Sequence, residues 1–273
     1  MIKEKAYGKI NIALDVLKKR SDGFHELKMI MIPIDIHDVL TFKISKEVKL
    51  IEKKKIENNA ILKAVELIKY QFSVKQGVTI ELEKNIPVGA GLAGGSADIA
   101  ATIRGLNRLW TLNMTDDDMK EIALKLGSDT LFCLYNMPAF VYGRGDQLLF
   151  IHQIPKMDIY LFPFKKEVLT KEVFQNHKIS PKEKRFEKVL NLYIRNKFDK
   201  AFKMTFNALE KTATEMDYEL KHHQKSVKKI SKSARMSGSG GTFYMIVNSS
   251  KSEKIEQKIR KVTLNAIKTK PKY

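Results

Sequence analysis

Glycines cluster in one segment of the chain: four of them fall within positions 89–95, and Ser96 follows directly. Glycine lets the backbone approach a ligand closely and point successive N–H groups toward it. Apolar residues at helical spacing come next, so the positive end of a helix is expected beside the same N–H groups. The segment predicts a triphosphate-binding loop, in which the Ser96 hydroxyl contacts a phosphate oxygen or a bound Mg²⁺. The predicted loop consists of Pro87, Val88, Gly89, Ala90, Gly91, Leu92, Ala93, Gly94, Gly95, Ser96 and Ala97.

The same glycines also fit a tight turn between a strand and a helix that binds no ligand. Two other phosphate loops are excluded, because a Walker loop needs Gly-Lys-Ser/Thr and a dinucleotide loop needs an acidic residue after the next strand. A second glycine cluster at Met236–Gly241 leads into the alternating segment Phe243–Val247. It fits either a turn into that strand or a second ligand loop.

Charged and amide side chains near the N-terminus share one face of a predicted strand. Ile10, Ile12, Leu14 and Val16 alternate with polar or small residues, which places Lys9 and Asn11 together on the opposite face. Asp129 follows a predicted helix end at Gly127. Taken singly, Lys9 fits a surface lysine on a strand face, and Asp129 fits an ordinary cap just after a helix.

The elements that position these residues alternate between strand and helix patterns. Residues 30–36 and 40–44 predict two strands joined around His37 and Asp38, and Ser21–Gly23 predicts a turn. Asn59 and Thr115 are placed to cap helices. Further strands are predicted at 78–82, 159–164 and 243–247, a helix at 99–110 after the glycine loop, and a final amphipathic helix near the C-terminus. The fold class is α+β in two halves, residues 1–155 and 156–273.

Composition places the chain among globular proteins of the cytoplasm. Its 273 residues include 43% hydrophobic and 30% charged residues, and a single cysteine excludes an intrachain disulfide. No run of about 18 apolar residues predicts a membrane span. The net charge of +19 comes from 42 lysines and eight arginines, spread along the chain among acidic residues. A lysine-rich surface explains this better than nucleic-acid recognition, which favours arginine.

The glycine segment and several shorter motifs resemble the galactokinase–homoserine kinase–mevalonate kinase (GHMP) superfamily. The string Pro-x-Gly-x-Gly-Leu-x-Gly-Gly-Ser is specific to it. The remaining motifs are similar to one branch, the kinases that phosphorylate the 2-hydroxyl of 4-diphosphocytidyl-2-C-methyl-D-erythritol in non-mevalonate isoprenoid biosynthesis. They are Gly8–Asn11, Asp22–Leu27, Leu126–Asp129, Gly143–Asp146, Thr170–Phe174 and Met236–Gly240, in the order of that branch.

This resemblance implies a two-domain kinase that binds ATP, with Mg²⁺, and its substrate in a cleft between the domains. Lys9 and Asp129 are then the catalytic pair, and the glycine loop binds ATP. Asn11, Thr170, Gly238 and Ser239 would contact the substrate. His25 would hydrogen-bond the cytosine edge, and Phe24 and Phe174 would sandwich the cytosine ring.

The chain departs from that branch at positions on the substrate side. Phe24 replaces a tyrosine, Thr130-Leu131 replace Val-Pro, and Ala208 replaces an aspartate. Two alternatives therefore stay open: a related kinase acting on another small alcohol, and an inactive relative that binds nucleotide or RNA. The expected partners are ATP and a small molecule, without a membrane and without nucleic acid, and the oligomeric state is unknown.

Overall fold

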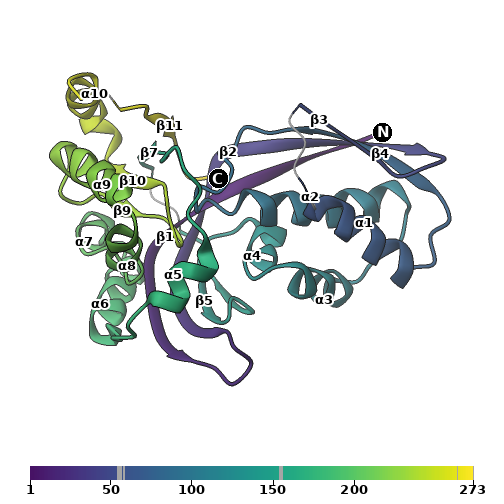
Figure 1. Cartoon of the computed structure of the whole chain (residues 1–273), viewed down its shortest axis with the longest axis horizontal. Helices are drawn as coiled ribbons and strands as arrows, with labels where there is room; N and C mark the ends of the chain where they lie inside the picture. The colour runs from purple at the N-terminus through teal and green to yellow at the C-terminus, as the bar shows by residue number, and fades with distance from the viewer. Residues whose placement is uncertain (54–56, 58, 154–155, 263, 273) are drawn as a thin grey trace. The chain divides into compact units, whose positions relative to one another are not determined.

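A computed structural model describes residues 1–53, 57, 59–153, 156–262 and 264–272. The chain forms two compact units that do not follow chain order. The first unit contains residues 1–8, 36–87 and 93–136, and the second contains 9–35, 88–92 and 137–273. The long strands β1 (Ile2–Lys19) and β2 (His25–Ser45) contribute residues to both (Figure 1). The boundary predicted at residue 155 falls on residues 154–155, which lie outside the described chain, and stays a prediction.

The first unit is a sheet covered by helices. The second half of β2 pairs antiparallel with β4 (Gly77–Glu83), which pairs parallel with β3 (Lys49–Glu52). The helices are α1 (Ala60–Gln71), α2 (Gly94–Leu109), α3 (Asp116–Leu126) and α4 (Thr130–Tyr135). A methyl group on Gly105 of α2 would meet the Phe42 ring of β2 at 2.5 Å, so glycine lets this helix lie directly on the sheet.

Helix boundaries in this unit confirm the predicted caps. The Asn59 side chain accepts a hydrogen bond from the Ile61 N–H at the start of α1. Thr115 and Asp118 form a capping box at the start of α3, and Gly127 is its C-cap. These local signals act over three or four residues, which explains why the sequence alone reveals them.

Two predicted boundaries are wrong. The pattern around His37 and Asp38 predicts a break, but β2 runs without interruption from His25 to Ser45. The buried Asp38 carboxylate accepts hydrogen bonds from the Asn85 and Ile86 N–H groups, so a polar residue is satisfied inside the strand. Helix α2 begins at Gly94 rather than after Ser96, so the last glycines of the loop form its first turn.

The second unit has two groups of strands. In one, β2 pairs with β5 (Ala139–Gly143), β5 pairs with β6 (Gln147–Phe150), and β1 pairs in parallel with β8 (Phe206–Asn207). The other is a sheet in the order β11 (Ile267–Thr269), β7 (Asp158–Phe162), β10 (Phe243–Val247) and β9 (Arg235–Met236). The helices of the second unit are α5 (Thr170–Asn176), α6 (Glu183–Ile194), α7 (Phe198–Lys203), α8 (Glu210–Met216), α9 (Tyr218–Ile230) and α10 (Ser252–Arg260).

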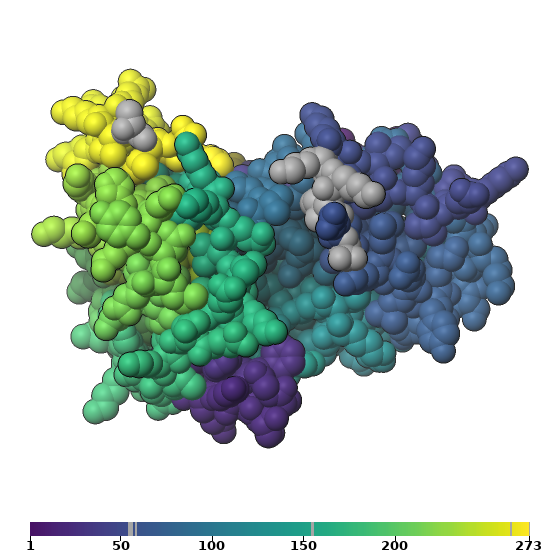
Figure 2. All heavy atoms as spheres, viewed as in Figure 1, coloured from purple at the N-terminus to yellow at the C-terminus, as the bar shows by residue number. Residues whose placement is uncertain are grey.

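Aromatic packing attaches α9 to the four-stranded sheet. The His223 ring lies against Phe243 and Phe164, and its Nε2 is 3.0 Å from the Phe162 carbonyl oxygen. The C-terminal helix α10, by contrast, has mostly exposed side chains, which form the yellow surface in Figure 2. Within the described part of the chain, no helix is long and apolar enough to cross a membrane.

Candidate active site

Lys9 is a buried cation held by two oxygen atoms. Its side chain is 3% exposed, and its Nζ donates to Asn11 Oδ1 at 2.8 Å and to the Gly91 carbonyl oxygen at 3.3 Å. The alternation in β1 correctly predicts that Lys9 and Asn11 lie on one face. A surface lysine is the wrong interpretation, because the side chain is buried. A buried ammonium group persists only where oxygen atoms compensate its lost hydration.

Two glycine loops meet next to this lysine within the second unit. Ser237 Oγ donates to the Gly91 carbonyl oxygen at 3.0 Å, and the Thr242 N–H donates to the Ala90 carbonyl oxygen at 3.1 Å. Gly91 has a φ of 71°, and a methyl group there would clash with the carbonyl oxygens of Ser237 and Gly240. Glycine is therefore required at position 91 by both conformation and close approach.

The start of α2 lies in the first unit and presents backbone N–H groups. Ala93, in the left-handed conformation, is its N-cap and makes no side-chain cap hydrogen bond, so Gly94, Gly95 and Ser96 form the first turn. These are the N–H groups that an α-helix leaves without intrahelical partners. A methyl group on Gly95 would meet nothing within 4 Å, so packing in the protein does not require glycine there. An anion binds favourably at such a terminus.

A buried ion cluster ties this helix start to the sheet. Lys84 Nζ lies 2.5 Å from Asp38 Oδ2 and 2.7 Å from Asp98 Oδ2 in α2. Burial raises the pKa of Asp98 to about 7, although the Lys84 charge acts in the opposite direction. Burial alone would lower the pKa of Lys84, but the two carboxylates raise it. This cluster contains titratable groups next to the first turn of α2.

Asp129 lies in the first unit at the N-terminus of the short helix α4. Its side chain makes no capping hydrogen bond to that helix, which argues against the interpretation of an ordinary cap. A methyl group on Gly127 would lie 2.8 Å from Thr130 Oγ1 and 3.6 Å from Ser96 Oγ. The segment that carries Asp129 is therefore adjacent to the first turn of α2.

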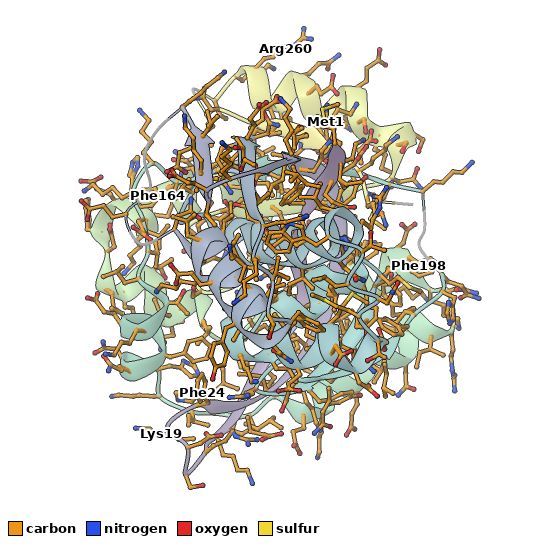
Figure 3. The ribbon with its side chains drawn as sticks, turned by 90° about the vertical axis from the view of Figure 1, so that its right-hand side faces the viewer. Met1, Lys19, Phe24, Phe164, Phe198 and Arg260 are labelled. Carbon is orange, nitrogen blue, oxygen red and sulfur yellow. The ribbon has the colours of Figure 1, made fainter. Side chains whose placement is uncertain are left out.

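The aromatic residues predicted to enclose a nucleobase each contact another side chain. The Phe174 ring packs on His25, with centroids 5.0 Å apart and planes tilted by 32°. Phe24 lies near the tip of the β1–β2 hairpin with Lys19 (Figure 3), and the Arg144 guanidinium lies 5.3 Å from its ring centroid. Burial, with a smaller effect of the Lys19 charge, lowers the pKa of His25, which favours the neutral imidazole.

Thr170 and Ser239 are in direct contact, with their hydroxyl oxygens 2.7 Å apart. Gly238 adjoins Ser239 and donates its N–H to Asn11 Oδ1 at 3.0 Å. The second unit thus brings together Lys9, Asn11, Thr170, Gly238 and Ser239, with residues 88–92 of the loop. Pro87, residues 93–97 of the loop and Asp129 belong to the first unit.

Sequence reasoning missed three residues that contact the predicted site. Arg144 lies within the motif Gly143–Asp146 at the end of β5, but the motif does not indicate what the arginine side chain contacts. Asn207 and Glu210 contact the Met236–Gly240 loop through long-range hydrogen bonds. Both residues flank Ala208, where the chain departs from the family pattern, but that departure gave no indication of which segment they support.

The fold and these loops define a kinase of the GHMP class, and residues 59–144 match the family described as "GHMP kinases N terminal domain". A solved 4-(cytidine 5'-diphospho)-2C-methyl-D-erythritol kinase has 25% sequence identity and a TM-score of 0.80, covering 100% of both chains. The Methanococcus jannaschii mevalonate kinase shares the fold, with a TM-score of 0.68 at 16% identity over 100% of this chain and 98% of that one.

Curated relatives identify the family within the GHMP kinases to which the chain belongs. The 4-diphosphocytidyl-2-C-methyl-D-erythritol kinase of Geobacillus sp. (strain WCH70) is 38% identical over 251 residues, covering 89% of this chain and 87% of the relative. The enzyme of that name from Caldanaerobacter subterraneus subsp. tengcongensis is 39% identical over 252 residues, with the same coverage. The chain belongs to the 4-diphosphocytidyl-2-C-methyl-D-erythritol kinase family.

Proposed function

We propose that this chain transfers the γ-phosphoryl group of ATP to the 2-hydroxyl of 4-diphosphocytidyl-2-C-methyl-D-erythritol, a step in non-mevalonate isoprenoid biosynthesis. The observation that carries the proposal is the buried Lys9, held by Asn11 and Gly91 between two glycine loops. Identity of 38% over 89% of the chain to a kinase named for this substrate supports the choice of acceptor. The buried thiol of Cys133 is consistent with a reducing cytoplasm, where we place the reaction.

We propose that Asp129 and Lys9 act on the same transfer. The acceptor hydroxyl oxygen forms a bond to the γ-phosphorus, the bond from that phosphorus to the bridging oxygen breaks, and ADP leaves. The hydroxyl proton passes to the Asp129 carboxylate, and the Lys9 ammonium stabilises the developing negative charge. A positioned base typically contributes about 10² to 10⁴ in rate, and alignment and charge stabilisation supply the rest.

The phosphates of ATP would bind at the first turn of α2, where Gly94, Gly95 and Ser96 present their N–H groups. Across the described residues, no group of three or more His, Cys, Asp or Glu side chains could hold a metal ion. Mg²⁺ commonly binds through substrate phosphates and water with few protein ligands, so this site is compatible with it. The Ser96 hydroxyl would hold the ion, which supplies charge neutralisation when bound.

For the cytidine end of the substrate, the support comes from the second unit. His25 packs on Phe174, and a neutral imidazole can both donate and accept a hydrogen bond at a base edge. Phe24 offers a second aromatic face, although Arg144 lies over its ring. Asn11, Thr170, Gly238 and Ser239 provide polar groups for the sugar alcohol and its diphosphate.

The deciding experiment measures ATP turnover with 4-diphosphocytidyl-methylerythritol and with a panel of other alcohols, among them mevalonate and homoserine. We expect kcat/KM for the cytidyl substrate to exceed every other by at least about 10³-fold, since a polar pocket rejects ligands that leave its groups unpaired. Phosphorus NMR of the product should show a new phosphomonoester on the 2-oxygen. Comparable turnover of another alcohol, or no turnover at all, would refute the proposed substrate.

A further inference from the structure

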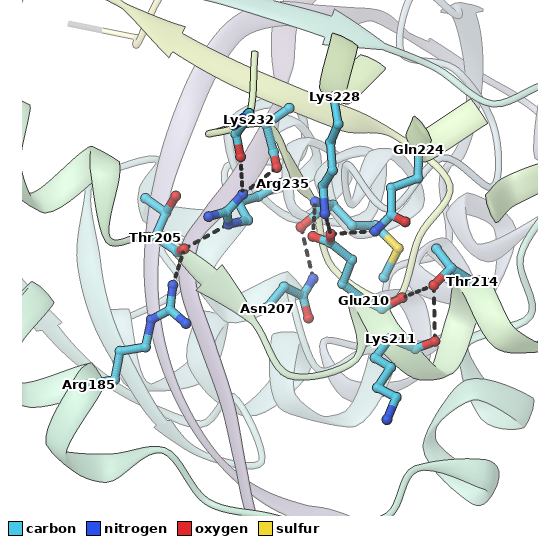
Figure 4. A network of polar contacts seen from close by, with 12 residues as sticks. Arg185, Thr205, Asn207, Glu210, Lys211, Thr214, Gln224, Lys228, Lys232 and Arg235 are labelled. Carbon is cyan, nitrogen blue, oxygen red and sulfur yellow. Dashed lines mark hydrogen bonds and ion pairs between the residues drawn. The ribbon is translucent and has the colours of Figure 1, made fainter. Parts of the chain in front are cut away.

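The loop Met236–Gly240 is held from behind by one buried amide. Asn207, only 7% exposed, donates from Nδ2 to the Met236 carbonyl oxygen at 2.8 Å and to the Gly238 carbonyl oxygen at 2.7 Å. Its Oδ1 accepts from the Leu209 N–H at 2.9 Å, which fixes the amide orientation. Figure 4 shows Asn207 among the polar residues of this network. Both carbonyl groups depend on the same Nδ2 atom.

The position of Asn207 is set by the strand that carries Lys9. Asn207 belongs to β8, where it pairs with Leu14 of β1, and the next N–H, from Ala208, donates to the Leu14 carbonyl oxygen at 2.9 Å. Backbone hydrogen bonds between β8 and β1 therefore fix the position of Asn207 relative to the strand that carries Lys9.

Glu210 holds the same loop through a different atom. Its Oε2 accepts from the Met236 N–H at 3.0 Å, and its Oε1 accepts from Gln224 Nε2 at 2.6 Å and Lys228 Nζ at 2.7 Å (Figure 4). Glu210 and Asn207 thus bind the N–H and the carbonyl group of one residue, Met236. A loop held at both groups has little freedom to rotate.

The loop in turn fixes the partner of Lys9. Asn11 Oδ1 accepts from the Gly238 N–H at 3.0 Å and from Lys9 Nζ at 2.8 Å. A displacement of Gly238 would therefore move or release the oxygen that holds the ammonium group. Gly238 also lies close to the Lys9 ammonium group, since a methyl group on Gly238 would be 3.2 Å from Lys9 Nζ.

We propose that Asn207 is a positioning residue for Lys9, acting through Gly238 and Asn11, with Glu210 fixing the same loop at Met236. This rests on the proposed phosphoryl transfer, in which Lys9 stabilises developing charge. A displacement of about 1 Å near the reacting groups can cost about 10² in rate. The role is distinct from general stabilisation of the fold, which would lower stability and leave the kcat of folded protein unchanged.

The first test is Asn207→Ala, assayed with ATP and the cytidyl substrate well below its melting temperature. We expect kcat to fall about 100-fold while the ATP KM stays within about threefold, because the α2 terminus belongs to the other unit. The matched control is Thr205→Val, which removes a buried hydroxyl that donates to the carbonyl oxygen of Phe202, three positions earlier on the chain. That variant should lose stability and keep its kcat. Equal kcat for Asn207→Ala and the wild type would overturn the proposal.

Asn207→Asp provides a second test that keeps the side-chain shape. A carboxylate would face the Met236 and Gly238 carbonyl oxygens without a proton, whereas the protonated acid donates to one of them. We expect the ratio of its kcat to the wild-type kcat to rise about tenfold between pH 8 and pH 6, since bonding to the neutral form raises an acid's pKa. A ratio independent of pH would contradict the positioning role. This variant decides the question if Asn207→Ala does not fold.

A third measurement does not depend on the substrate. Brief acylation with acetic anhydride, followed by mass spectrometry, reports how accessible and mobile the Lys9 amine is. We expect the Lys9 rate to rise about tenfold in Asn207→Ala, as the loss of buried hydrogen bonds implies, with Lys63 in α1 unchanged as the internal control. An unchanged Lys9 rate would overturn the inference. A raised rate in a protein that does not phosphorylate the cytidyl substrate would refute the proposed function alone.

Discussion

Each compact unit carries one member of the proposed catalytic pair, and the two units stabilise their part of the site with different chemistry. In the first unit, the start of α2 is tied to the sheet by charges, through Lys84, Asp38 and Asp98. In the second, Lys9 and its loop are tied by two amides, Asn11 and Asn207. The Glu210 carboxylate, paired with Lys228, holds the same loop at Met236. Burial raises the pKa of Asp98 in the first support to about 7, whereas the two amides of the second support do not titrate.

The charge of the chain divides in the same way. The first unit contains 16 basic and 14 acidic residues, whereas the second contains 34 basic and 17 acidic ones. The positive charge thus concentrates in the unit that holds Lys9 and the proposed substrate residues. Such a field would attract anionic ligands, including a nucleoside diphosphate. The amide network keeps Lys9 in a defined position within this lysine-rich unit.

The largest expected effect is on the pair itself. Asp129→Asn should lower kcat by about 10² to 10⁴ with ATP affinity unchanged, because the amide keeps the shape and cannot take a proton. Calorimetric titration with ATP and steady-state kinetics measure the two quantities. Asp117→Asn, at an exposed carboxylate of α3, is the control. If Asp129→Asn kept more than about a tenth of the wild-type kcat, Asp129 would not be the base.

The supports of the two units should respond differently to loss of a lysine. Lys84→Met leaves two buried carboxylates without their cation, which typically costs about 3–5 kcal/mol of unfolding free energy. Lys228→Met should cost less, about 1–2 kcal/mol, because Glu210 keeps bonds to Gln224 and the Met236 N–H. Urea unfolding monitored by circular dichroism measures both. Equal losses would remove the distinction between the supports.

Asp98 of the first unit should contribute to the pH dependence of stability. The unfolded chain releases the Asp98 proton near its ordinary pKa of 3.8, and the folded protein keeps it until about 7. Since the folded state then binds more protons, this group lowers stability as pH rises from about 4 to about 7. Asp98→Asn should remove that part of the slope, as measured by urea unfolding between pH 4.5 and 8. An unchanged slope would show that Asp98 titrates normally.

Substitutions at two glycines of the phosphate loop, one in each unit, should affect different properties of the protein. Gly91→Ala should destabilise the second unit by about 1–3 kcal/mol, because a positive φ and two carbonyl oxygens oppose the methyl group. Gly95→Ala should leave stability unchanged and weaken ATP binding, since its methyl group points into open space that we assign to phosphate. Thermal unfolding and ATP calorimetry compare the two. Unchanged ATP affinity in Gly95→Ala would contradict the loop assignment.

Local sequence signals predicted the parts of the fold that depend on near neighbours. Alternation identified β1 and placed Lys9 beside Asn11, and the capping box identified the start of α3. The glycine string identified the loop, but helical N-terminal residues and loop residues look alike, so the start of α2 was misplaced. The short strand β8 pairs with β1 across a long sequence separation, and no local pattern predicts it.

The same limit applies to the candidate site. Its family motifs gave the residues, because their order and spacing are specific. They did not reveal which residues touch: Phe174 packs on His25, while Phe24 lies under Arg144. Asn207 supports a loop about thirty residues later, a relationship that depends on the tertiary fold.

The smallest expected effect concerns selectivity for the base, where the second unit acts alone. If His25 binds the cytosine edge, the wild type should prefer the cytidine substrate over its uridine analogue by about ten- to a hundred-fold in kcat/KM, because uracil reverses the donor and acceptor and leaves a buried group unpaired. His25→Ala should reduce that ratio toward one. Phe24→Leu should weaken both substrates by a similar factor, since stacking does not depend on the polar edge. Parallel steady-state kinetics with both substrates measure the ratios. Equal kcat/KM values in the wild type would show that His25 does not read the base, while the kinase assignment would stand on Lys9 and Asp129.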